Sequence, residues 1–143
     1  MTIATSCFPC GHFDKKVSQS ELDDVEKELD CEFPEELAAL YLEVGAIYDD
    51  TSAAIVQGID YTVDDCKDFW GTNNEDIFMD MNSMFPFGGD GGGDRFFIRI
   101  SGSGLYLRGV YSWNHENDSR TWHANNIKDL LMRLSVDSME NSI

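Results

Sequence analysis

Apolar residues recur at helical spacing in the first half of the chain and predict two consecutive helices. The first is marked by Leu22, Val25 and Leu29, with mostly Asp, Glu and Lys at the positions between them. Ser18 and Glu21 stand three residues apart at its start, which is the spacing of a capping box. We therefore expect a helix that begins after Ser18 and ends near residue 31.

A second helix is predicted directly after the first, opened by Pro34. Proline disfavours the helical conformation in the residue before it and suits the first helical position itself. The apolar stripe of this helix consists of Leu37, Leu40, Tyr41 and Val44. Gly45 follows the stripe, where a glycine commonly caps the C-terminus of a helix. The two helices make a pair whose outer faces are strongly acidic.

The middle of the chain combines a strand pattern with a shorter helix pattern. Residues 53–59, AAIVQGI, predict a strand with a candidate bulge at Gly58. Residues 62–71 predict a third helix, capped at its start by Thr62. Its apolar residues are Val63, Cys66, Phe69 and Trp70.

The second half of the chain predicts a sheet and a closing helix. Strand patterns fall near residues 84–87, 95–100 and 105–111, and a Ser-Gly-Ser-Gly turn joins the last two as a hairpin. A final helix is expected from about Asn126. Its apolar face consists of Ile127, Leu130, Leu131 and Leu134.

Length and composition fit one globular domain of the α+β class. The chain has 143 residues, of which 42% are hydrophobic, and this excludes a disordered protein. We expect an N-terminal arm over residues 1–17 and a single domain over residues 18–143, with helices packed on a mostly antiparallel sheet. No apolar run approaches the ~20 residues of a membrane helix, and the N-terminus lacks a signal-peptide pattern. The expected compartment is the cytoplasm, where the four cysteines stay reduced.

The net charge of -17 is concentrated in one part of the chain. Residues 1–80 contain 20 acids and 4 bases, whereas residues 81–143 contain 7 acids and 6 bases. So negative a chain argues against a nucleic-acid partner. The acidity has two interpretations, a solvated face that keeps the protein soluble or a patch directed at a basic protein partner.

If the acidic part contacts a partner, its contact residues are expected where acids and aromatic residues follow the second helix. The candidates for this contact are Tyr48, Asp49, Asp50, Asp60, Asp64, Asp65, Asp68, Trp70, Glu75 and Asp76.

Cys7 and Cys10 form a C-x-x-C pair, which is half of a zinc site. A complete zinc pattern needs a second pair at defined spacing, whereas Cys31 and Cys66 are single residues far apart. A redox C-x-x-C follows a strand and opens a helix, and this pair stands at the start of the chain. We therefore predict no metal site and no cofactor.

The loop GGDGGGD at residues 88–94 combines glycines with two aspartates. A phosphate loop requires a lysine that is absent here, and the aspartates would repel phosphate. A calcium loop of the EF-hand type requires further oxygen ligands at the positions of Phe96 and Phe97. We therefore expect a structural loop, in which glycines supply positive φ and aspartates bond nearby amides.

His115, with Glu116 beside it, is a candidate acid/base group together with Asp90 and Asp94. No serine or cysteine nucleophile signature and no metal triad accompanies it, so we predict that the chain is not an enzyme. The three tryptophans are expected to pack in the core, and one left exposed would be a candidate anchor for a partner. They are Trp70, Trp113 and Trp122.

The order of these elements resembles the SUKH superfamily, which includes the yeast cell-wall-synthesis regulator and many bacterial toxin-immunity proteins. The resemblance covers roughly residues 18–134. It rests on an acidic first helix, then FPEELAALYLEVG, MFPFG, DGGGD, RFFIRI, VYSWNHEND and the closing NNIKDLLMRL, in that order. The residues that match the family motif are Pro34, Gly45, Asp90, Gly92, Gly93, Asp94, Trp113 and His115.

The resemblance implies helices packed on a curved antiparallel sheet and a binding role without catalysis. Relatives with different partners share the motif. The resemblance therefore implies that the motif maintains the fold and does not determine which partner is bound. The leading hypothesis is an immunity protein that neutralises a toxin with a basic surface, such as a nuclease. The alternatives are a regulatory scaffold and, less favoured, a metal-binding or enzymatic domain.

Overall fold

The computed structural model describes residues 12–13, 16–48, 53–71, 81–89, 92–101 and 103–141. The helices are α2 (Gln19–Leu29), α3 (Glu35–Glu43), α4 (Ile59–Phe69) and α5 (Ile127–Asn141). One antiparallel sheet has the order β4 (Met84–Gly89), β5 (Arg95–Arg99), β6 (Val110–Trp113) and β7 (Arg120–Ala124). A smaller antiparallel sheet joins β1 (His12–Phe13), β2 (Ile47–Tyr48) and β3 (Ala54–Val56).

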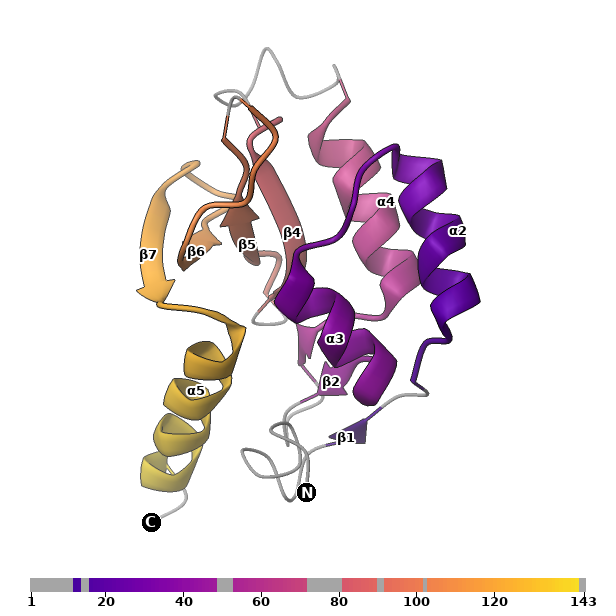
Figure 1. Ribbon diagram of the computed structural model, residues 1–143. Helices are drawn as coiled ribbons and strands as arrows, with labels where there is room; N and C mark the ends of the chain where they lie inside the picture. Colours follow the sequence, from indigo (N-terminus) through magenta and orange to yellow (C-terminus); the bar gives the residue numbers. More distant parts are fainter. Residues whose placement is uncertain are drawn as a thin grey trace.

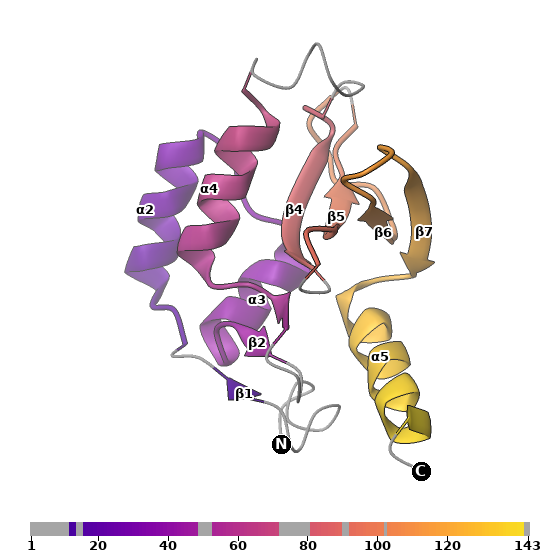
Figure 2. The same ribbon diagram turned by 180° about the vertical axis from the view of Figure 1, so that it is seen from behind.

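The helices and the larger sheet form an α+β arrangement, as the sequence predicts. Figures 1 and 2 show α2 and α4 lying side by side, with α4 next to β4 at one edge of the sheet. α5 follows β7 at the other edge, and α3 lies between the helix pair and α5. β1 pairs with β2, so part of the expected N-terminal arm joins the small sheet.

The core fills the space between the helices and one face of the larger sheet. Leu37 and Tyr41 of α3, Phe85 of β4 and Leu130 of α5 are fully buried there. Because side chains alternate along a strand, Phe96 points into this core while its neighbour Phe97 points to the opposite face. On that face a second, smaller cluster contains Phe69, Met81, Met84, Phe97 and Trp113.

The first two predicted helices are confirmed, and their ends lie within two residues of the predicted positions. Ser18 caps α2, and its side chain accepts a hydrogen bond from the amide of Glu21. Pro34 lies at the N-cap of α3, one position before the helix that it was expected to open. Gly45 follows the C-cap of α3 with φ of 80°, a conformation that favours glycine.

The prediction for residues 53–71 is wrong at the boundary between the strand and the helix. β3 ends at Val56, Gly58 is the N-cap of α4, and the helix begins at Ile59, before Thr62. Thr62 is fully buried, and its hydroxyl lies 2.6 Å from the hydroxyl of Tyr41 on α3. A contact between two helices therefore explains this threonine, which caps nothing.

The third predicted strand, at residues 105–111, is displaced. β6 begins only at Val110, and Tyr106 makes a single bridge to Ile100. The next paired residues are Phe97 and Tyr111. They lie three residues from the bridge along β5 but five residues from it along the segment that leads into β6. The extra residues form a bulge. The strand β7 has no counterpart in the prediction.

The glycines of the predicted loop have two different roles. Gly88 lies within β4, where a Cβ atom would stand 1.7 Å from the carbonyl oxygen of Ile55 in β3. This glycine therefore permits close packing, and the expectation of positive φ is wrong for it. Gly93 does have positive φ, at 99°.

Candidate partner-binding surface

Helices α2 and α4 run parallel to each other. Together they contain most of the acidic residues of the described helices. α2 has five acids and one base over its 11 residues, and α4 has four acids and one base over its 11 residues. Their apolar residues, among them Leu22 and Val63, are buried against the core. We call the outward surface of α2 and α4 the acidic face.

A row of three aspartates runs along α4. Asp60, Asp64 and Asp68 are all exposed, and they are spaced four residues apart. Residues at this spacing lie above one another on one side of a helix. Tyr61 stands next to the row and is 68% exposed. The row therefore presents negative charge and one large aromatic ring to the solvent.

One ion pair connects the two helices across the acidic face. Lys67 Nζ of α4 lies 2.8 Å from Glu28 Oε2 of α2, and both side chains are about half exposed. Surface pairs of this kind contribute at most about 1 kcal/mol. The pair neutralises one acid and leaves the acidic face strongly negative.

Asp65, which the sequence places among the contact residues, is directed into the protein. Its Oδ2 lies 2.7 Å from Arg95 Nε of β5 and accepts a hydrogen bond of 2.8 Å from Gln57 Nε2. The side chain is largely buried. Asp65 therefore joins α4 to the sheet, while its neighbour Asp64 faces the solvent.

The two aromatic candidates also have internal contacts. Trp70 is half-buried, its Nε1 donates a hydrogen bond of 2.8 Å to the carbonyl oxygen of Met84, and its ring packs edge-on against Phe85. Tyr48 is half-buried in β2. The remaining candidates, Asp49, Asp50, Glu75 and Asp76, lie outside the described residues.

The motif residues Gly93, Asp94 and His115 meet where β5 begins and β6 ends. Asp94 Oδ1 accepts a hydrogen bond of 3.1 Å from the backbone amide of His115 and lies 2.7 Å from its Nδ1. These contacts hold the pKa of the Asp94 carboxyl below its ordinary value. A Cβ atom on Gly93 would stand 2.9 Å from Cε1 of the His115 ring. The three residues therefore join the start of β5 to the end of β6, and we call this contact the Asp94 latch.

Trp113, the last residue of β6, makes further contacts near the Asp94 latch. It is 6% exposed, it packs edge-on against Phe69 of α4, and its Nε1 donates a hydrogen bond of 2.7 Å to Asp118 Oδ1. Asp118 has φ of 59° in the turn to β7 and also bonds Arg120. We call the part of the sheet formed by Gly93, Asp94, Trp113, His115 and Asp118 the sheet corner.

Other motif residues lie at different places in the fold. Pro34 is buried at the start of α3, and Gly92 is exposed just before the latch. Asp90 lies outside the described residues. Of the described motif residues, Asp94, Trp113 and His115 thus make contacts that join secondary-structure elements.

The cysteines within the described residues are in unreactive surroundings. Burial raises the pKa of the Cys66 thiol well above its ordinary value, and it also raises the pKa of the half-buried Cys31. Among the described residues, no three His, Cys, Asp or Glu side chains gather as a metal site would require. Cys7 and Cys10 lie outside the described residues.

Trp122 is the tryptophan that the fold leaves most exposed. Its side chain is 46% exposed on β7, and the guanidinium of Arg133 lies 5.2 Å from its ring centroid. The sequence expectation that all three tryptophans pack in the core is wrong for Trp122.

The fold and this distribution of charge define an α+β domain with an acidic helical face and a tightly bonded sheet corner. The model of the SMI1 / KNR4 family (SUKH-1) matches residues 16–133. The chain belongs to this family, as the order of its motifs predicts. No curated protein matches the chain. In the described part of the chain, no helix has the length and apolar character needed to cross a membrane.

Proposed function

We propose that this protein is an immunity protein that binds a toxin with a basic surface and blocks it, using the acidic face. One observation carries the proposal: Asp60, Asp64 and Asp68 form a single exposed row on α4. Membership of the SMI1 / KNR4 family supports a binding role.

The physical basis of the proposal is charge complementarity. A nuclease toxin must hold a polyanion, so its active groove is basic, and an acidic protein competes for that groove. Opposite charges also steer the two proteins together and raise the association rate, to as much as ~10⁸–10⁹ M⁻¹s⁻¹ at low salt. Inhibition of this kind needs no catalysis, no cofactor and no metal from the immunity protein.

The contacts divide the ten candidate residues into groups. Asp60, Asp64 and Asp68 are proposed to face the toxin, with Tyr61 as an aromatic neighbour. Asp65 and Trp70 are proposed to support the surface from inside, because they bond to Arg95 and Met84 of the sheet. Tyr48, which is half-buried in β2, and the four candidates outside the described residues stay predictions.

The test takes the C-terminal domain of a toxin whose gene lies beside the gene for this protein and measures its affinity for the purified protein. The variant replaces Asp60, Asp64 and Asp68 by Asn, which removes three charges at constant shape. The control replaces Glu43 and Glu116 by Gln, since these exposed acids lie outside α2 and α4. We expect the Asn variant to bind at least ~10-fold more weakly and the control to bind like the wild type.

Two results would contradict the proposal. One is a wild-type protein that does not bind the toxin domain. The other is an equal loss of affinity in the Asn variant and in the Gln control, because this would assign the effect to net charge and not to the row on α4.

A further inference from the structure

We infer that the protein carries a second contact region, a groove beside residues 103–109 that receives a short basic segment of the toxin anchored by an apolar side chain. This inference rests on the proposed function and describes its partner more closely. The groove consists of two adjoining cavities at one side of the helices, and we call it the leucine groove after Leu105 and Leu107.

The two cavities share a wall. The first, with a volume of about 520 Å³, is lined by the ends of α2 and α4, by the start of α3 and by Leu105. The second, of about 540 Å³, is lined by the starts of α3 and α5 and by Leu107 and Arg108. Tyr106 and Glu35 line both. Each volume falls within the range of about 300–1,000 Å³ that accommodates ligand groups.

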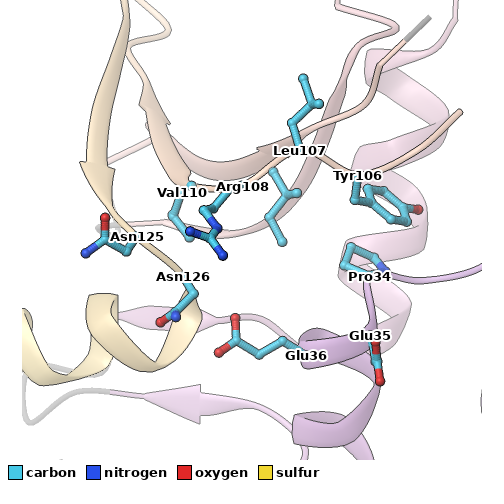
Figure 3. Close-up of a pocket in the computed structure, with 11 residues that line it drawn as sticks. Pro34, Glu35, Glu36, Tyr106, Leu107, Arg108, Val110, Asn125 and Asn126 are labelled. Carbon is cyan, nitrogen blue, oxygen red and sulfur yellow. The ribbon is translucent and has the colours of Figure 1, made fainter. Parts of the chain in front are cut away.

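The bulge between β5 and β6 exposes two leucines at the rim of the groove, and Figure 3 shows the side chain of Leu107 directed away from the second cavity. The bulge turns the segment around Tyr106 out of regular pairing, and the hydroxyl of Tyr106 bonds to the carbonyl oxygen of Glu32. The side chains on either side of this tyrosine are left in solvent: Leu105 is 69% exposed and Leu107 is 41% exposed. Exposed leucines that line cavities are typical of a contact region.

The charge around the first cavity selects a cation. Asp30, Glu32 and Glu35 line it, and Asp30 and Glu32 are exposed. Asp30 is also the C-cap of α2, and Trp70, in the same wall, is the C-cap of α4. The C-terminal end of a helix carries partial negative charge, so two helix ends add to the carboxylates. A lysine or arginine side chain of the partner fits this environment.

The second cavity has a different character and fixes the direction of the segment. Figure 3 shows Arg108 and Glu36 extending into it from opposite sides, with Asn126 beside Glu36. Glu36 is already engaged, because its two oxygens accept hydrogen bonds of 2.6 and 3.0 Å from the amides of Ile127 and Lys128. The positive charge of Arg108 therefore suits this end of the groove to a carbonyl or carboxylate group of the partner. The basic side chain of the partner belongs in the first cavity.

The leucine groove is continuous with the acidic face. The first cavity begins at the residues that end α2 and α4, the two helices that carry the acidic face. Asp68 lies two residues before Trp70, so a toxin at this end of the acidic face is close to the groove. The acidic face attracts the basic surface as a whole, and the groove holds one segment of it.

The experiment compares the Leu105→Ser, Leu107→Ser double variant with the wild type in affinity for the toxin domain named above. We expect binding to weaken at least ~10-fold, since apolar anchors carry much of the energy of an interface. The thermal midpoint is expected to be unchanged because both side chains are exposed. The matched control is Met132→Ser on α5, where the side chain is 50% exposed, and its affinity is expected to equal that of the wild type.

A photo-cross-linking amino acid at position 105, and separately at position 132, gives an independent measurement. We expect position 105 to cross-link a toxin peptide that contains lysine or arginine near an apolar residue, and position 132 to give no adduct. Two results would refute the groove as a contact region and leave the proposed function intact. They are unchanged affinity in the serine variant and an absent adduct at position 105 in a formed complex. A wild-type protein that binds no toxin would overturn both.

Discussion

Asp64 on α4 and Asp94 at the start of β5 are both aspartates, but their surroundings differ. Asp64 is exposed and belongs to a row of like charges on the acidic face. Asp94 accepts hydrogen bonds at the sheet corner, where it joins two strands. An acid that accepts hydrogen bonds from a neighbouring strand supports the fold, whereas an exposed acid such as Asp64 is accessible to a partner. We therefore expect mutations in the two regions to affect different measurements.

The largest loss of stability is expected at the sheet corner for Trp113→Ala. The substitution removes a buried ring that packs against Phe69 and leaves Asp118 without its indole donor. Comparable core truncations cost about 3–5 kcal/mol in the free energy of unfolding. The control is Trp122→Ala, which removes a half-exposed ring and is expected to cost less than about 1 kcal/mol. Urea unfolding of both variants measures the difference, and equal losses would contradict it.

A smaller loss is expected for Gly93→Ala, at about 2 kcal/mol, because alanine is strained at φ of 99° and its Cβ meets the His115 ring. Gly104→Ala is the matched control, since Gly104 also has positive φ but has open space around it. We expect the control to cost about 1 kcal/mol, the part due to backbone strain alone. If both variants lose the same stability in thermal unfolding, the ring of His115 plays no part in the latch.

The Asp94 latch also predicts a dependence on pH. The folded-state pKa of Asp94 lies below its unfolded value of about 3.9, so its contribution is present above that pH and is lost as the pH falls through the lowered folded value. Asp94→Asn is therefore expected to be less stable than the wild type at pH 6. The difference should shrink at pH 3, as measured by urea unfolding at both values. A difference that stays constant between them would contradict the latch.

The smallest effect on stability is expected on the acidic face. Replacing Asp60, Asp64 and Asp68 by Asn removes repulsion between like charges four residues apart, so the free energy of unfolding should change by less than about 0.5 kcal/mol. The same variant is the one expected to lose toxin binding. A marked destabilisation in urea unfolding would show that these residues serve the fold, and the contrast between the two regions would disappear.

The elements that the sequence predicts well are those specified by local signals. Ser18 and Glu21 determine where α2 begins through a contact three residues apart, and the apolar spacing of α5 is regular. The start of α4 is missed because Thr62 looks like a cap, whereas its hydroxyl contacts Tyr41, which is distant in the sequence. β7 is missed because its residues, RTWHA, lack a clear alternation of apolar and polar positions.

The candidate surface also has some features that follow from local sequence and others that depend on residues distant in sequence. The row on α4 could be found from the spacing of Asp60, Asp64 and Asp68, once the helix is correctly placed. The inward direction of Asp65 could not, because it depends on Arg95, which lies 30 residues away in the sequence. The leucine groove depends on a bulge between β5 and β6 and on the meeting of three helix ends, and neither leaves a pattern in the sequence.

The proposed contact between the acidic face and a basic toxin is tested most directly by the association rate constant at increasing salt concentration. Measured by stopped flow with the toxin domain, the wild-type rate should fall steeply between low and physiological ionic strength, because salt screens the attraction. The variant with Asn at positions 60, 64 and 68 should associate more slowly at low salt and show a shallower dependence. Identical rates for the two proteins at every salt concentration would contradict the proposed contact.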